Sequence, residues 1–168
     1  MPSDPSRAEA EKHVVYEIEA MCLAAARYAE DWGAKLHQAT PWGCEDAVFF
    51  LEASLGHARA LVMAFGYPGR NERRLVKALG TPKGYEKAFR QGFSHPSVTT
   101  DRAYGQLSEL IGHIGQARWD APFGIDVHQP VEVAYSVLDA LDSCGATTVN
   151  AALKAAVDKG RECLPAAV

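Results

Sequence analysis

Apolar residues recur at steps of three and four positions along most of this chain, which is the spacing of one face of an α-helix. The first such stretch covers about residues 8–38. Its apolar positions are Val14, Val15, Ile18, Met21, Cys22, Ala25, Tyr28, Trp32 and Leu36. The pattern predicts a long amphipathic helix with these side chains facing the core.

Thr40 and Pro41 indicate the start of a second helix, because threonine caps helix N-termini and proline is tolerated in the first turn. We expect this helix over about residues 42–65, ended by the turn-forming residues 66–69. Its broad apolar face consists of Val48, Phe49, Leu51, Leu55, Ala58, Leu61, Val62 and Phe65.

Two shorter segments follow. Residues 71–79 suit a short helix ended by Gly80, and residues 81–89 suit another brief helical segment. Pro96 disfavours helix at His95, so we place this histidine at a helix end or in a loop. A third long helix is expected beyond it, with an apolar side made of Ala103, Tyr104, Leu107, Leu110, Ile111, Ile114 and Trp119.

Pro130 opens a fourth apolar-periodic stretch, which Gly145 interrupts. Thr147 or Thr148 is positioned to begin a last helical segment. The inward positions of the first stretch are Val133, Val137, Leu138 and Leu141, and the last segment carries Val149, Leu153, Ala156 and Val157. Because no stretch alternates as a strand does, we predict an all-α protein, a four-to-five-helix up-and-down bundle.

The length of 168 residues and the 48% hydrophobic content fit one compact domain. We expect a polar lead-in over residues 1–12, a single helical bundle over 13–160 and a tail over 161–168. No apolar run is long enough for a membrane span or a secretory signal, so we expect a cytoplasmic protein without membrane contact. The cysteines show no CxxC spacing and are interpreted as buried apolar residues.

Charge is distributed unevenly along the chain. Residues 70–90 contain seven cations and two anions, a local net charge of +5, while the whole chain carries −4. The basic residues are Arg70, Arg73, Arg74, Lys77, Lys83, Lys87 and Arg90. Such a segment attracts phosphates locally, although a solvated helix face is the commoner interpretation of a charge run.

Arg90 ends this basic segment, and His95 follows five residues later, a spacing that places two reactive groups close together. Arginine stays charged and donates paired hydrogen bonds to phosphate, and histidine transfers protons near neutral pH. Arg7 and His13 have a related spacing near the chain start. Because Arg90 lies at the end of the basic segment, we favour the Arg90–His95 pair over the Arg7–His13 pair.

The helix containing Leu55-Gly56-His57-Ala58-Arg59, the basic connection, the Arg90-to-His95 motif and a further long helix resemble the HEPN superfamily, closest to its abortive-infection branch. The likeness covers roughly residues 16–119. It implies a helical bundle that acts as a dimeric, metal-independent ribonuclease, in a defence or toxin-antitoxin system.

Carried onto this chain, the resemblance implies that His95 transfers the proton and Arg90 holds the phosphate, with Lys87 and Ser94 as auxiliaries. The RNA's 2'-hydroxyl is then the nucleophile, and neither metal nor other cofactor is required. The dimer supplies a second arginine and histidine. The implied partners are a second copy, RNA and an antitoxin or regulatory protein, with RNA contacts at Arg73, Arg74, Lys77, Lys83 and Lys87.

Three alternatives stay open. Gln91 and Pro96 depart from the pattern of active members, which favours a catalytically inactive dimeric bundle that binds nucleic acid or a partner protein. His57 and Arg59, in the middle of an apolar helix, are expected to organise the bundle or its dimer contact. A three-histidine metal site formed by His57, His95 and His113 is the third interpretation.

Overall fold

The computed structural model describes residues 4–35, 45–93 and 129–166, and every regular element within these ranges is an α-helix. The predicted all-α class is therefore confirmed for this part of the chain. The third long helix expected after Pro96 lies outside the described residues. The helices are α1 (Arg7–Lys35), α2 (Glu45–Gly66), α3 (Arg70–Ala78), α4 (Tyr85–Gly92), α6 (Gln129–Ser143), α7 (Ala146–Val149) and α8 (Ala151–Cys163).

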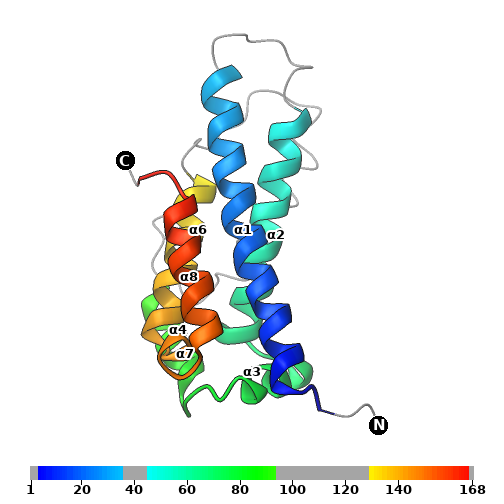
Figure 1. Cartoon of the computed structure of the whole chain (residues 1–168), viewed down its shortest axis with the longest axis vertical. Helices are drawn as coiled ribbons and strands as arrows, with labels where there is room; N and C mark the ends of the chain where they lie inside the picture. Colours follow the sequence, from blue (N-terminus) through cyan, green and yellow to red (C-terminus); the bar gives the residue numbers. More distant parts are fainter. Residues whose placement is uncertain (1–3, 36–44, 94–128, 167–168) are drawn as a thin grey trace.

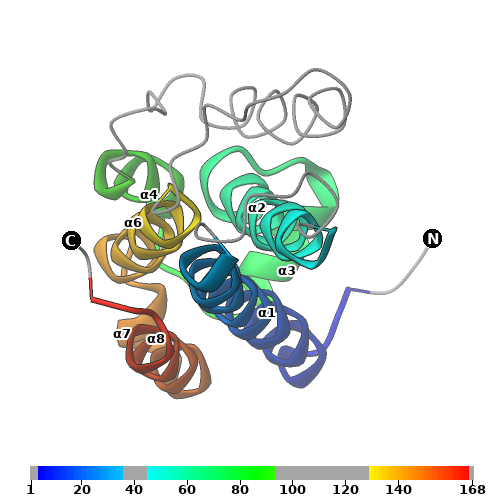
Figure 2. The same ribbon diagram turned by 90° about the horizontal axis from the view of Figure 1, so that it is seen from above.

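Helix α1 lies between the other long helices and contacts α2, α6 and α8 (Figures 1 and 2). Helices α2 and α6 run opposite to α1, whereas α8 runs in the same direction (Figure 1). The short helices α3, α4 and α7 lie toward the end of the bundle where α1 begins (Figure 1). The long helices thus form one bundle around α1.

The apolar face predicted for the first helix is buried wherever the structure describes its side chains, and only Val15 is partly exposed. The helix begins at Arg7, within the segment predicted as a polar lead-in. Ser6 and Glu9 form a capping box there: the Glu9 amide donates to Ser6 Oγ at 3.3 Å, and the Ser6 amide donates to Glu9 Oε2 at 2.8 Å. This reciprocal cap explains why the helix begins at Arg7, one residue before the predicted start at about residue 8.

Helix α2 ends at Gly66, as the turn residues predicted. Most of its expected apolar face is buried, but the inward placement of Phe49 is wrong, because this ring is 64% exposed. Phe49 instead packs edge-on against Phe50, with centroids 5.7 Å apart. Leu51 and Leu55, on the side toward the core, are buried. Periodicity alone overestimated the width of the buried face.

Left-handed glycines connect α3 to α4: Gly80 has φ 80° and Gly84 has φ 82°. Helix α4 begins after Gly84 and runs to Gly92, beyond the predicted limit at residue 89. A Cβ at Gly92 would lie 2.5 Å from the Ser143 side chain, so the glycine lets α4 approach α6 closely.

Helix α6 includes Pro130 in its first turn, as predicted, and Gly145 with φ 74° follows its end. The last helix is not capped by Thr147 or Thr148, which lie in α7. Asn150 caps α8 instead, because its side-chain oxygen accepts a hydrogen bond from the Leu153 amide at 3.1 Å. Helix α8 continues past residue 160, to Cys163.

The cysteines divide into two classes. Cys22 and Cys144 are buried as predicted, but Cys163 is exposed at the end of α8, which corrects the expectation that the cysteines are buried; Cys44 lies outside the described residues. None of the described helices combines the length and the apolar character that crossing a membrane requires.

Candidate functional site

Helix α4 positions Arg90, and aromatic stacking fixes this helix to the bundle. The Phe89 ring stacks with Phe65 of α2 and with Phe93, at centroid distances of 5.9 Å and 6.3 Å. Phe89 and Phe93 are each only 1% exposed. Burying a side chain of this size stabilises by about 1.5–3 kcal/mol, so α4 has a defined place against α2.

The Arg90 guanidinium is held at the C-terminal end of α2. Its Nη1 donates a hydrogen bond to the Gly66 carbonyl at 2.7 Å. Its central carbon lies 5.5 Å from the centroid of the Tyr67 ring, a cation–π distance. A guanidinium has five N–H donors. The contact with Gly66 therefore orients the group and leaves donors for a phosphate oxygen.

His95 and Ser94 lie outside the described residues, which end on this side at Phe93. The predicted pairing of Arg90 with His95 consequently stays a prediction. Tyr85, in the first turn of α4, is not a proton-transfer group near neutral pH. Burial, with a smaller contribution from the neighbouring Glu86 carboxylate, raises the pKa of its hydroxyl to about 12.

The predicted RNA-binding cations fall into two groups. Arg73 Nε lies 3.5 Å from Glu86 Oε1, and Arg74 Nε lies 2.8 Å from Asp4 Oδ1, so both arginines have acidic partners. Lys77, Lys83 and Lys87 are exposed and form no ion pair with a described residue. We call these three lysines and Arg90 the basic end. The contact between Arg73 and Glu86 links a side chain of α3 to one of α4 there.

His57 of α2 contacts α1 through a carboxylate. Its Nδ1 lies 2.7 Å from Glu17 Oε2, and the edge of its ring faces Tyr16 at a centroid distance of 5.6 Å. The second Glu17 oxygen lies 3.9 Å from His13 Nε2. Since the Glu17 and His57 side chains are only 13% and 24% exposed, this contact is shielded from water and joins α1 to α2. Arg59 is partly buried in the same helix.

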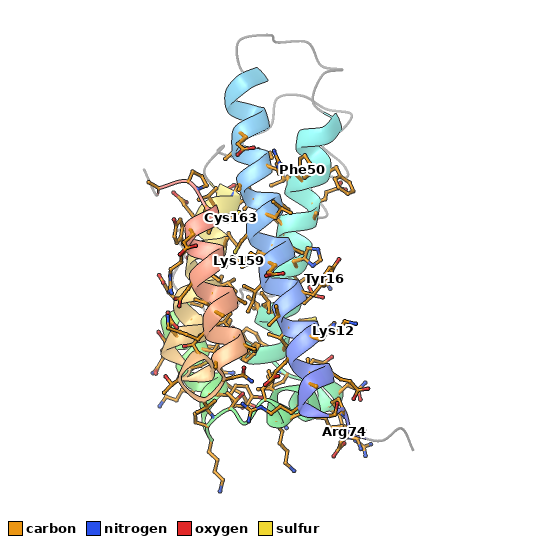
Figure 3. All side chains as sticks on the ribbon, viewed as in Figure 1. Lys12, Tyr16, Phe50, Arg74, Lys159 and Cys163 are labelled. Atoms are coloured by element: carbon orange, nitrogen blue, oxygen red, sulfur yellow. The ribbon has the colours of Figure 1, made fainter. Side chains whose placement is uncertain are left out.

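An open hollow of about 650 Å³ lies along the outer face of α1, between α2 and α8. We call it the α1 groove. Three of the four large apolar side chains that are exposed in the described part of the chain line it: Tyr16, Leu23 and Phe49, at 60%, 54% and 64% exposure. Figure 3 shows Phe50 on α2, and Lys159 and Cys163 on α8. Charge in the groove is largely paired, because Lys159 Nζ contacts Glu19 Oε1 at 2.7 Å.

A second hollow, of about 520 Å³, lies between the start of α1, the end of α2 and α3. His13 and Arg74 both line it. Arg7, the other member of the spacing match near the chain start, binds Glu11 Oε1 at 2.8 Å and the Val149 carbonyl at 3.3 Å. That arginine is therefore engaged with its own helix and with the residues before α8.

Sequence reasoning missed the α1 groove and the role of Glu17. Tyr16 and Leu23 are seven residues apart and fall outside the predicted buried face of their helix. Apolar residues at a second helical spacing, off the core face, were the available signal. Nothing in the sequence identified Glu17 as the partner of His57, because the two residues are 40 positions apart.

Among the described residues, no group of three histidine, cysteine, aspartate or glutamate side chains could hold a metal ion. The proposed three-histidine set includes His95 and His113, which lie outside these residues. Comparison of the chain with family models, with curated proteins and with solved structures found no match.

Proposed function

We propose that this chain binds RNA at the basic end and cleaves it as a HEPN-like, metal-independent endoribonuclease that acts as a dimer, in a defence or toxin-antitoxin system. The observation that supports the proposal is a fixed guanidinium on the same short helix as the exposed Lys87, which forms no ion pair with a described residue. Arg90 and Lys87 are three residues apart on α4, the spacing of side chains on one helix face. Phosphate groups of a single strand would meet positive charge here that no described carboxylate neutralises.

The chemistry uses the RNA's own 2'-hydroxyl as nucleophile. His95 takes its proton, the oxygen attacks the phosphorus and the 5'-oxygen of the next nucleotide leaves, so the product is a cyclic phosphate. Arg90 stabilises the charge on the non-bridging oxygens. In other enzymes proton transfer contributes about 10²–10⁴-fold and charge stabilisation by one donor about 10²–10³-fold.

A dimer completes this proposal, because one histidine cannot both take the first proton and already hold another for the leaving oxygen. Two copies related by a two-fold axis would supply a second histidine and a second arginine. The helical bundle supplies the rigid support for such a site.

The test is cleavage of a single-stranded RNA by the purified full chain in excess chelator. We expect cleavage that requires the 2'-hydroxyl, so an RNA with 2'-O-methyl groups throughout is bound but not cut. His95→Ala is expected to lower the rate by about 10²–10⁴-fold and to leave RNA affinity unchanged. Unchanged cleavage by this variant contradicts the assignment, and so does a strictly monomeric active protein in sedimentation.

Arg90 requires a separate control, since its contact with Gly66 also supports the fold. Arg90→Lys keeps the charge and removes the planar fork. If this variant keeps the melting temperature within a few degrees but cleaves much more slowly, the guanidinium acts on the phosphate. Equal losses of melting temperature and activity indicate a structural role instead.

The second candidate function is a catalytically inactive dimeric bundle that binds nucleic acid or a partner protein. The observation in its favour is the 2.7 Å hydrogen bond to the Gly66 carbonyl, which gives Arg90 a use without any substrate. In this case RNA is bound with the same basic end, no cleavage occurs and His95→Ala changes nothing. Absence of RNA binding at low salt contradicts both nucleic-acid functions.

A further inference from the structure

Helices α1 and α8 lie side by side and parallel, and three side-chain contacts from α1 to the segment 149–159 define their register. Arg7 binds the carbonyl of Val149, Glu11 accepts a hydrogen bond from Asn150, and Glu19 accepts one from Lys159. These partners differ by 139 to 142 positions. The same offset carries Cys22 of α1 to Cys163 of α8, which is three residues beyond Gly160 on the same helix.

Gly160 lets the two helices approach closely about one turn before Cys163. A Cβ added to Gly160 would lie 2.8 Å from the Cys22 sulfur and 3.6 Å from its Cβ. Cβ atoms joined by a disulfide are about 3.5–4.5 Å apart, so the two backbones reach a disulfide-compatible separation at Cys22 and Gly160. Cys163 is three residues further on α8, the neighbouring position on the same helix face. Formation of the disulfide requires the Cys22 sulfur to turn from Gly160 toward Cys163, a change of its χ1 rotamer.

The two thiols differ in exposure, although both line the α1 groove. Cys163 is exposed at the end of α8, and the buried Leu164 and the hydrogen bond from the Tyr135 hydroxyl to the Pro165 carbonyl at 3.2 Å hold the chain there. Cys22 is 1% exposed. Burial, and to a smaller extent the neighbouring Cys163 thiol, raises the pKa of Cys22 to about 12. An oxidant in solution therefore meets Cys163 first.

We propose that Cys22 and Cys163 are a redox modification site, at which a peroxide produces an intramolecular disulfide that locks α8 to α1. The inference is independent of the proposed ribonuclease function. It assigns a use to the one exposed cysteine of the described residues.

The reaction has two balanced steps. The Cys163 thiol loses its proton and its sulfur attacks a peroxide oxygen, which gives a sulfenic acid and one water molecule. The Cys22 sulfur then displaces the sulfenic oxygen, which leaves as a second water molecule, and the disulfide forms. Two thiols are oxidised by two electrons in total, and one hydrogen peroxide is reduced to two water molecules.

The disulfide would close a loop of about 140 residues, which strongly restricts the unfolded chain. We expect the midpoint of thermal unfolding to rise by roughly 5–10 °C on oxidation and to return on reduction with dithiothreitol. A cross-link accompanied by a lower midpoint would show that it distorts the helix pair, and would overturn the proposed locking.

The test treats the reduced full chain with hydrogen peroxide and identifies the product by non-reducing tryptic digestion and mass spectrometry. We expect the peptide of residues 13–27 to be joined to that of residues 162–168, with loss of two hydrogens. Cys163→Ser should remove the linkage and the change in melting, whereas Cys144→Ala, which alters another buried thiol, should leave both intact.

Three results would overturn the proposal. One is oxidation of Cys163 to a sulfinic or sulfonic acid while Cys22 is still alkylated by iodoacetamide after unfolding. Another is a linkage to Cys44 or Cys144 in place of Cys22. The last is a purely intermolecular disulfide, visible as a dimer on a non-reducing gel.

Discussion

The basic end and the α1 groove have opposite arrangements of apolar and charged residues. At the basic end the aromatic rings face inward, with Phe89 1% exposed, and the lysines face solvent without described acidic partners. In the α1 groove the aromatic ring of Phe49 is 64% exposed, while Lys159 and His57 contact carboxylates. One surface therefore presents charge, and the other presents apolar area.

This difference indicates two kinds of contact. Unpaired cations attract a polyanion at long range, and salt weakens that attraction. An exposed apolar hollow with paired charges gains free energy only when it removes apolar surface from water. RNA binding is accordingly expected at the basic end and not in the α1 groove.

The largest effect on stability should come from replacing a phenylalanine by alanine, and it should differ between the two regions. Phe89→Ala leaves a cavity between Phe65 and Phe93, so we expect the free energy of unfolding to fall by about 3–5 kcal/mol. Phe49→Ala removes a mostly exposed ring and should cost less than about 1 kcal/mol. Urea denaturation measures both. Similar losses for the two variants would contradict the difference in burial.

Replacing a glycine by alanine should change the stability in opposite directions at Gly92 and Gly56. Gly92→Ala places a methyl group against Ser143 and 3.1 Å from the Ala140 Cα, and should destabilise the protein by about 1–3 kcal/mol. Gly56→Ala meets nothing within 4 Å and should stabilise α2 by about 0.5–1 kcal/mol. The denaturant midpoint of each variant shows whether its stability rises or falls. If both variants are less stable, the close approach of α4 to α6 does not explain the loss at Gly92.

The shielded charge contact beneath the α1 groove should matter more than an exposed one. Glu17→Gln removes the charge that His57 contacts, and we expect a loss of about 1–2 kcal/mol, because the pair is mostly buried. Glu30→Gln breaks the exposed contact with Arg27 and should cost about 0–0.5 kcal/mol. Thermal or urea unfolding at neutral pH distinguishes them; equal costs would remove the distinction.

The smallest effect on stability should come from the lysines, whose effect on binding is the clearest. Replacing Lys77, Lys83 and Lys87 with glutamine should change stability by less than about 0.5 kcal/mol per site. The slope of log affinity for single-stranded RNA against log salt should fall in magnitude by about 2.

The matched control for this variant removes three cations from other surfaces, Arg27, Lys154 and Lys159, each of which has an acidic partner. RNA affinity and its salt dependence should stay close to those of the parent chain. An equal loss in both variants would indicate attraction by net charge alone, without a defined basic end.

Much of the local structure followed from the sequence because its determinants are local. The spacing of Val14, Ile18 and Met21 predicted the buried face of α1, and the glycine and proline after residue 65 predicted the end of α2. Asn150 as the cap of α8 and the capping box at Ser6 were also readable, but were overlooked. Arg90 was identified as a candidate, but its contacts with Gly66 and Tyr67 were not predicted, because those residues lie more than 20 positions earlier in the chain.

The sequence by itself determined that this chain forms amphipathic helices, where most of them lie, and that cations gather between residues 70 and 90. Helical periodicity and short-range composition carry that information. Only the tertiary structure decided that Glu17 meets His57, that Phe49 faces solvent, that three lysines form no ion pair with a described residue and that Cys22 packs against Gly160. These outcomes depend on the rotation and register of one helix against another, which packing over the whole bundle sets.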